Sequence, residues 1–385
     1  MQYTNTEKKR VVILGAGYGG TALAKLLDPH FAVTLIEQRE QFFHNVGSLR
    51  AAVDSSWLST LFIPYDRLLH NGHLIHNTVS DITQTEVRFK TGETLPFDYL
   101  VLATGSNYPF PAKMPFHDMT HAHALVVQVN ERIRRAQRIL LIGAGPVGIE
   151  FAGEIASVYP DKRITLIDVA PRLLGQFHPK MGQLLLKDLH SLGVEVILGE
   201  SLQNVPDETN ALDGEPLGMC QFVTTTGRVL DADLYFVCFG VQPNTSYLRP
   251  HFADSLDERG FVKVNQYLQV ESYPSIFALG DMTNVKETKM AQTASAQAKS
   301  IAESLKRLSQ KASTSATLKA YTPRSTVAAI VPVGPRLGAV HLPFGKGLVL
   351  GAFAASRIKG KTLLANRYWK ELGMTFPSSP QERRG

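Results

Sequence analysis

The chain has 385 residues, of which 44% are hydrophobic and 19% are charged, and its net charge is +6 at pH 7. This is the composition of a globular protein large enough to bury two or three cores. No apolar run reaches the ~18 residues that a membrane-spanning helix needs. The sequence contains two cysteines, Cys220 and Cys238, which excludes a disulfide framework and fits a reducing compartment.

The first predicted element is a buried parallel strand from Val11 to Leu14, and a glycine-rich turn and a helical pattern follow it. The turn carries a G-x-G-x-x-G signature formed by Gly15, Gly17 and Gly20, with Tyr18 and Gly19 inside it. The next apolar strand ends at Glu37. The first glycine permits the turn, the second lets the backbone approach a pyrophosphate, and the third lets helix pack on strand. Glu37 is placed to accept hydrogen bonds from a ribose.

The same pattern returns 128 residues later, after a predicted strand from Ile139 to Ile142. Its turn contains Gly143, Gly145, Pro146, Val147 and Gly148. The strand after its helix ends at Asp168. Each helix N-terminus directs free N–H groups and a positive dipole end at phosphates. Two such units can hold two dinucleotides, and the simplest use of two is to pass a hydride between them.

Two further apolar segments end in glycine turns, residues 97–106 (FDYLVLATGS) and 275–284 (SIFALGDMTN). The order of the four segments resembles the FAD-dependent pyridine nucleotide oxidoreductases. The resemblance implies an α/β fold with two Rossmann-like domains, the second inserted in the first, and a small C-terminal α+β unit. The expected limits are 1–112 and 249–320 for the FAD domain, 113–248 for the NAD(P)H domain, and 321–385 for the C-terminal unit.

The resemblance also implies which residues bind the cofactors. FAD is expected at the first signature and Glu37, and NAD(P)H at the second signature and Asp168. The other residues expected to contact a cofactor are Arg50, Ala103, Thr104, Gly105, Gly240, Asp281, Lys289, Met290 and Ala291. The N-terminal N–H groups of the helix that begins near Met290 are expected at the flavin.

One branch of the family is particularly similar. The segments FFHNVGSLRA at 42–51, TKMAQTA at 288–294 and YWK at 368–370 resemble the ferroptosis-suppressor, or apoptosis-inducing-factor-like mitochondrion-associated, NAD(P)H:quinone oxidoreductases, which are related to type II NADH dehydrogenases. The Cys-x4-Cys pair of the disulfide reductases is missing from residues 42–51. The implied activity is hydride transfer from NADH or NADPH to flavin N5 and then two-electron reduction of a quinone, without a redox-active disulfide.

Three residues are candidates for catalysis. Glu150 begins the second signature's helix and could position the nicotinamide or relay a proton, although an acid there also stabilises the helix dipole. Lys359 matches a lysine of the quinone-reducing family and could stabilise a quinol oxyanion, or it is a surface lysine. His44 could protonate a quinone or is a packed histidine. The histidines show no metal-ligand spacing, so no metal is predicted.

The charge pattern bears on the nucleotide and on partners. Asp168 disfavours a 2′-phosphate and so predicts NADH, while Arg172 nearby leaves NADPH open. The segment from Arg357 to the end of the sequence contains seven Lys and Arg but only two Glu, with aromatic residues between them. Such a basic segment suits either contact with an anionic membrane surface or a solvated face. The prediction is a cytoplasmic protein, peripheral on a membrane if this face binds lipid, with no signal peptide and no N-myristoylation site at Met1-Gln2.

Several alternatives stay open at this point. A ferredoxin or rubredoxin reductase, or a specialised biosynthetic flavin oxidoreductase, would use the same domains with another acceptor. An NAD(P)H-responsive redox sensor or DNA-binding flavoprotein is an alternative of another class. No DNA-binding motif is present, so no specific nucleic acid is predicted. A homodimer is also left open.

Overall fold

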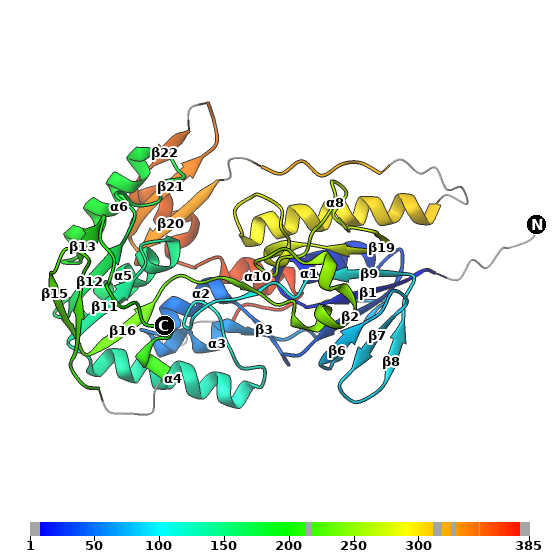
Figure 1. Ribbon diagram of the computed structural model, residues 1–385, viewed down its shortest axis with the longest axis horizontal. Helices are drawn as coiled ribbons and strands as arrows, with labels where there is room; N and C mark the ends of the chain where they lie inside the picture. The colour runs from blue at the N-terminus through cyan, green and yellow to red at the C-terminus, as the bar shows by residue number, and fades with distance from the viewer. Residues whose placement is uncertain (1–7, 213–216, 311–317, 325–327, 346, 378–385) are drawn as a thin grey trace, which may run out of the picture.

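The computed structural model describes residues 8–212, 217–310, 318–324, 328–345 and 347–377. Met1-Gln2, on which the acylation prediction depends, and the basic residues Arg383 and Arg384 lie outside the described residues. The strands that precede the two glycine signatures, β1 (Arg10–Leu14) and β11 (Arg138–Ile142), belong to two separate sheets (Figure 1). Among the described residues, no helix is both long and apolar enough to cross a membrane.

The first sheet has the strand order β18-β19-β9-β1-β2-β5. These strands are Gln269–Val270, Tyr273–Ala278, Tyr99–Leu102, Arg10–Leu14, Ala32–Glu37 and His73–His76. All neighbouring pairs are parallel except β18 with β19. Val11 and Ile13 of β1 pack into a core with helices α1 (Tyr18–Leu27) and α8 (Ala291–Gln310), and Val12 and Leu14 pack into a second core on the opposite face. Burial on both faces explains why the strand is apolar without alternation.

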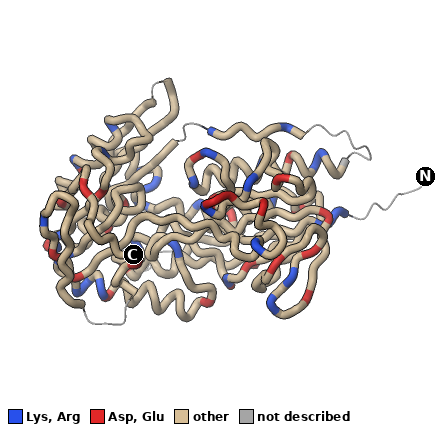
Figure 2. The backbone as a smooth tube through the Cα atoms, viewed as in Figure 1, with Lys and Arg blue, Asp and Glu red and all other residues tan. Residues whose placement is uncertain are grey.

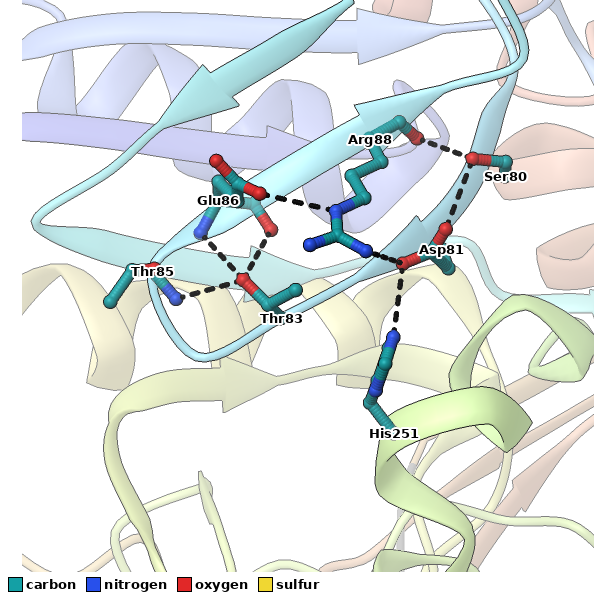
Figure 3. A network of polar contacts seen from close by, with 7 residues as sticks. All are labelled: Ser80, Asp81, Thr83, Thr85, Glu86, Arg88 and His251. Atoms are coloured by element: carbon teal, nitrogen blue, oxygen red, sulfur yellow. Dashed lines mark hydrogen bonds and ion pairs between the residues drawn. The ribbon is translucent and has the colours of Figure 1, made fainter. Parts of the chain in front are cut away.

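A small antiparallel sheet covers that second face. It consists of β6 (Val79–Ile82), β7 (Glu86–Phe89) and β8 (Thr94–Pro96). Figure 3 shows the polar network that holds it: Asp81 lies 3.4 Å from His251 and 3.7 Å from Arg88, and Arg88 also pairs with Glu86 at 3.1 Å. Because His251 belongs to α7 (Arg249–Phe252), the network fastens this sheet to the segment that returns from the second unit.

The second sheet has the order β13-β12-β11-β16 and is parallel throughout. Its strands are Glu195–Leu198, Arg163–Asp168, Arg138–Ile142 and Leu234–Val237. The accompanying elements are α4 (Met119–Arg135), α5 (Pro146–Val158), α6 (Pro179–Ser191) and the hairpin of β14 (Cys220–Val223) and β15 (Val229–Ala232). The chain leaves the first sheet through β10 (Ser106–Asn107) and returns through β17 (Gln242–Pro243), which pair antiparallel. The predicted insertion of the second Rossmann-like unit in the first is therefore confirmed.

The C-terminal part is a three-stranded antiparallel sheet followed by short helices, as the predicted α+β unit requires. Its elements are β20 (Ala329–Val333), β21 (Leu337–Leu342), β22 (Leu348–Leu350), α9 (Ala352–Ala355), the π-helical turn η6 (Ser356–Gly360) and α10 (Ala365–Glu371). Gly153 of α5 allows a close approach, since a Cβ there would lie 2.6 Å from the Val333 Cα. Tyr368 and Trp369 of α10 pack into the core of the first unit. The C-terminal part therefore contacts both dinucleotide units.

A short connecting segment lies between the two units. It runs through β3 (Phe42–Phe43), α2 (Asn45–Ala51), η1 (Ser55–Trp57), α3 (Leu58–Leu61) and β4 (Phe62–Ile63). The indole N–H of Trp369 donates a hydrogen bond of 3.0 Å to the Thr60 carbonyl. The connecting segment and the C-terminal helices are thus held together, although about 300 residues separate them in the sequence.

Candidate active site

The two glycine turns have the backbone that the signatures require. Gly15 and Gly143 have φ values of +97° and +109°, which favour glycine. A Cβ on Gly20 would lie 1.8 Å from the Gly15 carbonyl oxygen, and one on Gly148 would lie 2.0 Å from the Gly143 carbonyl oxygen. These third positions therefore allow each helix to pack against its own turn.

The middle glycines have a different environment. A Cβ on Gly17 or on Gly145 would meet no protein atom within 4 Å. Gly105 (φ +66°) and Gly240 (φ +94°) are open in the same way. Glycine at these positions therefore leaves space beside the backbone at both helix N-termini, and this space suits a group that approaches closely, such as a pyrophosphate.

Glu37 and Asp168 have equivalent positions in the two units. A Glu37 carboxylate oxygen accepts from the Ala16 N–H at 2.7 Å, and an Asp168 oxygen accepts from the Ala144 N–H at 2.6 Å. The other oxygen of Asp168 accepts from the Ala170 N–H at 2.7 Å. Each acid therefore braces its own glycine turn, and a carboxylate oxygen still has lone pairs to accept a hydroxyl proton.

Residues 103–105 lie against the first turn. A Cβ on Gly15 would be 2.5 Å from the Ala103 carbonyl oxygen. Thr104 and Asn244 exchange two hydrogen bonds: the Thr104 hydroxyl donates to the Asn244 carbonyl (2.8 Å), and the Asn244 amide donates to the Thr104 carbonyl (2.9 Å). This segment therefore joins the first turn to the strand by which the chain returns from the second unit.

Asp281 has a half-buried cationic partner that the sequence did not reveal. Lys113 donates to Asp281 Oδ2 at 2.9 Å and to the Ser106 hydroxyl at 2.6 Å, and that hydroxyl donates to the same Asp281 oxygen at 2.9 Å. Burial by itself would raise the pKa of Asp281, but the Lys113 charge and the hydrogen bonds hold it below its usual value. In the sequence, Lys113 is visible only as a single lysine between Pro111 and Pro115, and this pattern does not indicate which group its side chain contacts.

The start of α8 contains polar groups that suit a ligand. Lys289 donates to the carbonyls of Thr283 (2.6 Å) and Val285 (3.1 Å), and burial lowers its pKa. Met290 precedes the helix, and its carbonyl accepts the N–H groups of Thr293 and Ala294. The Thr293 hydroxyl is buried and has no hydrogen-bond partner within the described part of the chain. Together with the open glycines of the first turn, this unsatisfied hydroxyl fits a bound FAD.

Glu150 and Lys359 form a buried ion pair. The Lys359 Nζ lies 2.6 Å from Glu150 Oε1, and the two side chains are 14% and 11% exposed. Burial raises the pKa of Glu150, and the Lys359 charge opposes part of that increase. The structure thus brings together two of the three predicted catalytic residues, from α5 of the nucleotide unit and η6 of the C-terminal part.

His44, the third candidate, is completely buried. Its Nε2 lies 2.9 Å from the Leu363 carbonyl and its Nδ1 lies 3.1 Å from the Tyr18 hydroxyl. Because a carbonyl only accepts, Nε2 carries the proton and Nδ1 accepts from Tyr18. Burial lowers the pKa of His44 to about 4, so the ring is neutral at pH 7. Both nitrogens therefore have protein partners, as a packed histidine would.

Arg50 and Glu154 form a second buried ion pair, with an Nη2–Oε1 distance of 2.7 Å. The Arg50 donors predicted to face a cofactor are thus directed at protein groups. Arg172 likewise donates to the carbonyls of Gly175 and Phe177, within its own loop.

The two cysteines are free and separate. Cys220 lies in β14, and Cys238 is a core residue immediately after β16 whose pKa burial raises to about 12. Such a thiol is unreactive at neutral pH. No group of three or more His, Cys, Asp and Glu side chains in the described ranges could hold a metal ion.

The sequence matches the pyridine nucleotide-disulphide oxidoreductase family model over residues 9–298. It is 34% identical to apoptosis-inducing factor homolog B of Dictyostelium discoideum, over 97% of this chain and 99% of that protein. It is 30% identical to ferroptosis suppressor protein 1 of Homo sapiens, over 95% of this chain and 96% of that protein.

Solved structures share the fold. Sulfide:quinone oxidoreductase from Aquifex aeolicus has a TM-score of 0.73 at 19% identity. The match covers 98% of this chain and 94% of that protein. NDH2 from Plasmodium falciparum in complex with NADH has a TM-score of 0.68 at 15% identity, with 95% of each chain covered. The chain therefore belongs to the pyridine nucleotide-disulphide oxidoreductase family and is an FAD-dependent flavoenzyme that uses a pyridine nucleotide.

Proposed function

We propose that this flavoenzyme oxidises NADH and reduces a quinone by two electrons. The buried Glu150–Lys359 pair is the observation that carries the proposal. It places a carboxyl and an ammonium group where the nucleotide unit meets the C-terminal part, while both cysteines are free. Two solved structures of similar fold support the same chemistry: NDH2 was solved in complex with NADH, and sulfide:quinone oxidoreductase is named for a quinone.

The two dinucleotides are assigned to the two glycine turns. Gly17, Glu37, Gly105, Asp281 and the start of α8 would hold FAD, since they surround the first turn. Gly145, Asp168 and Gly240 would hold the nicotinamide nucleotide at the second turn. When bound, FAD supplies hydride acceptance from the nicotinamide and electron donation to the acceptor.

The protein's part in the chemistry is to manage charge and protons. Reduction of a quinone consumes two protons, and Glu150 is suited to transfer one because burial raises its pKa and so favours the protonated carboxyl. The Lys359 ammonium can donate a hydrogen bond to a developing oxyanion on the acceptor. His44 is assigned a positioning role because both of its nitrogens already have partners.

The nucleotide preference is assigned to Asp168. Its carboxylate repels a 2′-phosphate and can accept from a free 2′-hydroxyl, so NADH is preferred over NADPH. Asp168→Asn should reduce the ratio of kcat/KM for NADH over NADPH by ~10-fold. Steady-state assays with both nucleotides test this, and an unchanged ratio would contradict the assignment.

The C-terminal part also offers a surface for a lipid-soluble acceptor. Phe353 is 81% exposed and Ile358 is 45% exposed, and the Arg357 guanidinium lies 6.0 Å from the Phe353 ring centroid. Exposed apolar side chains beside a cation suit the interface of an anionic membrane. Figure 2 shows acidic and basic residues spread over the fold rather than gathered on one element, which does not favour a nucleic-acid-binding function.

Anaerobic titration followed by an acceptor panel tests the proposal. NADH should bleach the bound flavin, and short-chain ubiquinone or menaquinone analogues should restore its colour within the turnover time. Ferredoxin and rubredoxin serve as protein acceptors in parallel. Rapid reoxidation by a protein acceptor without reaction with quinones would replace the quinone assignment with a ferredoxin-type reductase.

A further inference from the structure

Arg50 makes contacts that neither signature explains. It lies in α2 and is 5% exposed. Its Nε and Nη2 donate to the two carboxylate oxygens of Glu154 at 2.9 and 2.7 Å. Its Nη2 and Nη1 also donate to the Gly360 carbonyl (2.6 Å) and the Lys361 carbonyl (3.0 Å). The guanidinium carbon lies 4.8 Å from the Trp57 ring centroid.

These contacts fix both segments that carry the Glu150–Lys359 pair. Glu154 lies one helical turn after Glu150 on α5, and Gly360 follows Lys359 directly. A single guanidinium therefore contacts the Glu154 side chain on α5 and the backbone that follows Lys359. The planar guanidinium of Arg50 can contact both segments at once because its N–H donors point in fixed directions. A lysine at position 50 would present a single flexible ammonium group.

The backbone after Lys359 depends on such support. Leu363 and Leu364 have φ values of +48° and +62°, a left-handed conformation that is unfavourable for residues with a Cβ, and they follow a π-helical turn. A strained segment persists only where its surroundings determine its conformation. Arg50 supports this segment by hydrogen bonds to the carbonyls of residues 360 and 361, and His44 supports it by a hydrogen bond to the Leu363 carbonyl.

We propose that Arg50 is a positioning residue, which holds Lys359 in register with Glu150, and is not a cofactor ligand. The inference rests on the proposed role of the pair. Lys359, Glu154 and Arg50 are the charged groups that act on Glu150, and Lys359 also acts on His44. If Arg50 is removed, Lys359 is released and Glu154 loses its counter-charge, so both changes disfavour the Glu150 carboxylate.

The test compares Arg50→Met, Arg50→Lys and Glu154→Gln with Arg88→Met, which removes an ion-paired arginine from the β6–β7–β8 sheet (Figure 3). Three properties are measured: the FAD dissociation constant, the pH dependence of anaerobic flavin reduction by NADH, and the rate of tryptic cleavage after Lys359 and Lys361 in the FAD-free protein. Glu150→Gln identifies which pH midpoint belongs to Glu150.

Arg50→Met should slow flavin reduction at pH 7 by ~100-fold, because the Glu150 carboxyl, which is expected to position the nicotinamide for hydride transfer, would be displaced by about 1 Å. The Glu150 midpoint should move upward by ~1 pH unit. Tryptic cleavage should become ~10-fold faster as the segment opens locally. The FAD dissociation constant should change by less than ~3-fold, because Arg50 directs its donors to protein groups. Arg50→Lys should restore part of the rate, and Arg88→Met should match the wild type.

A loss of FAD affinity of ~10-fold or more with an unchanged Glu150 midpoint would overturn the inference and make Arg50 a cofactor ligand. Unchanged cleavage and an unchanged midpoint would also overturn it. If Arg50→Met fails to fold, Arg50→Lys gives the same comparison. Glu154→Gln removes a negative charge that raises the pKa of Glu150 and leaves the Arg50 charge in place, so it should move the Glu150 midpoint downward. None of these measurements uses a quinone, so a wild type that is reduced by NADH but ignores quinones refutes only the acceptor assignment.

Discussion

Two acids one turn apart on α5 each have a buried cation as partner, Glu150 with Lys359 and Glu154 with Arg50. Removing one member of a buried pair leaves the other charge without compensation, which costs more than the pair contributes. Substitutions here must therefore be read with folding and cofactor content measured alongside activity.

Glu150→Gln should lower the turnover number by ~10²–10³-fold, because the amide retains a hydrogen-bond acceptor for Lys359 but cannot transfer a proton. FAD content, measured by absorbance, should stay equal to that of the wild type. Glu131→Gln, on the exposed face of α4, is the control and should leave turnover unchanged. Loss of turnover in step with loss of FAD would show that Glu150 acts on binding instead.

His44 should make the protein less stable in acid. Its folded pKa of about 4 lies below the ordinary histidine value of 6.5, so the unfolded chain binds the proton more readily. The associated stability is complete above about pH 6.5 and is lost as the pH falls through about 4, by a total of ~3 kcal/mol. Thermal melts of the wild type and of His44→Gln should therefore converge between pH 7 and pH 4. Melting temperatures that stay in parallel over this range would exclude the effect.

At the scale of elements, the glycines of one turn have different structural environments. Gly20 lies where a Cβ would meet the Gly15 carbonyl at 1.8 Å, whereas Gly17 faces open space. One position therefore serves packing and the other serves the ligand, although both belong to the same short turn.

Gly17→Ala should keep the melting temperature of the FAD-free protein within ~2 °C of the wild type, because its φ of −74° suits alanine and nothing lies within 4 Å. FAD affinity should fall by at least ~10-fold, since the new methyl group occupies the space assigned to the pyrophosphate. Gly20→Ala, the paired variant, should destabilise the FAD-free protein itself. Equal FAD affinity in Gly17→Ala and the wild type would place the cofactor elsewhere.

At the scale of the whole molecule, the C-terminal part packs against both dinucleotide units. It packs on α5 at Gly153, its α10 enters the core of the first unit, and it presents Phe344, Phe353 and Ile358 to solvent. Its exposed apolar residues are therefore the surface on which an interaction with lipid is expected.

The protein should sediment with vesicles that contain anionic lipid, and raising the salt concentration should weaken this binding. Phe353→Ser should reduce the fraction bound by ~10-fold, because a phenyl ring would no longer be buried in the interface. Phe116→Ser, which changes a phenylalanine that is 40% exposed just before α4, is the control. Equal losses for the two variants, or no binding by the wild type, would refute a specific C-terminal surface.

The sequence by itself determined the two units, their order and their insertion. Glycine turns, apolar strands and strand-end acids depend on residues close together in the chain, so they are visible as local sequence patterns. The residues around Gly15 and Gly143 could be assigned without any knowledge of distant segments. Only the tertiary structure decided which partners Arg50, Lys113 and His44 have. Those partners lie 104, 168 and 319 residues away, at Glu154, Asp281 and Leu363. A local pattern records whether a side chain is charged or apolar, but the packing of the three parts of the fold determines which polar group it meets.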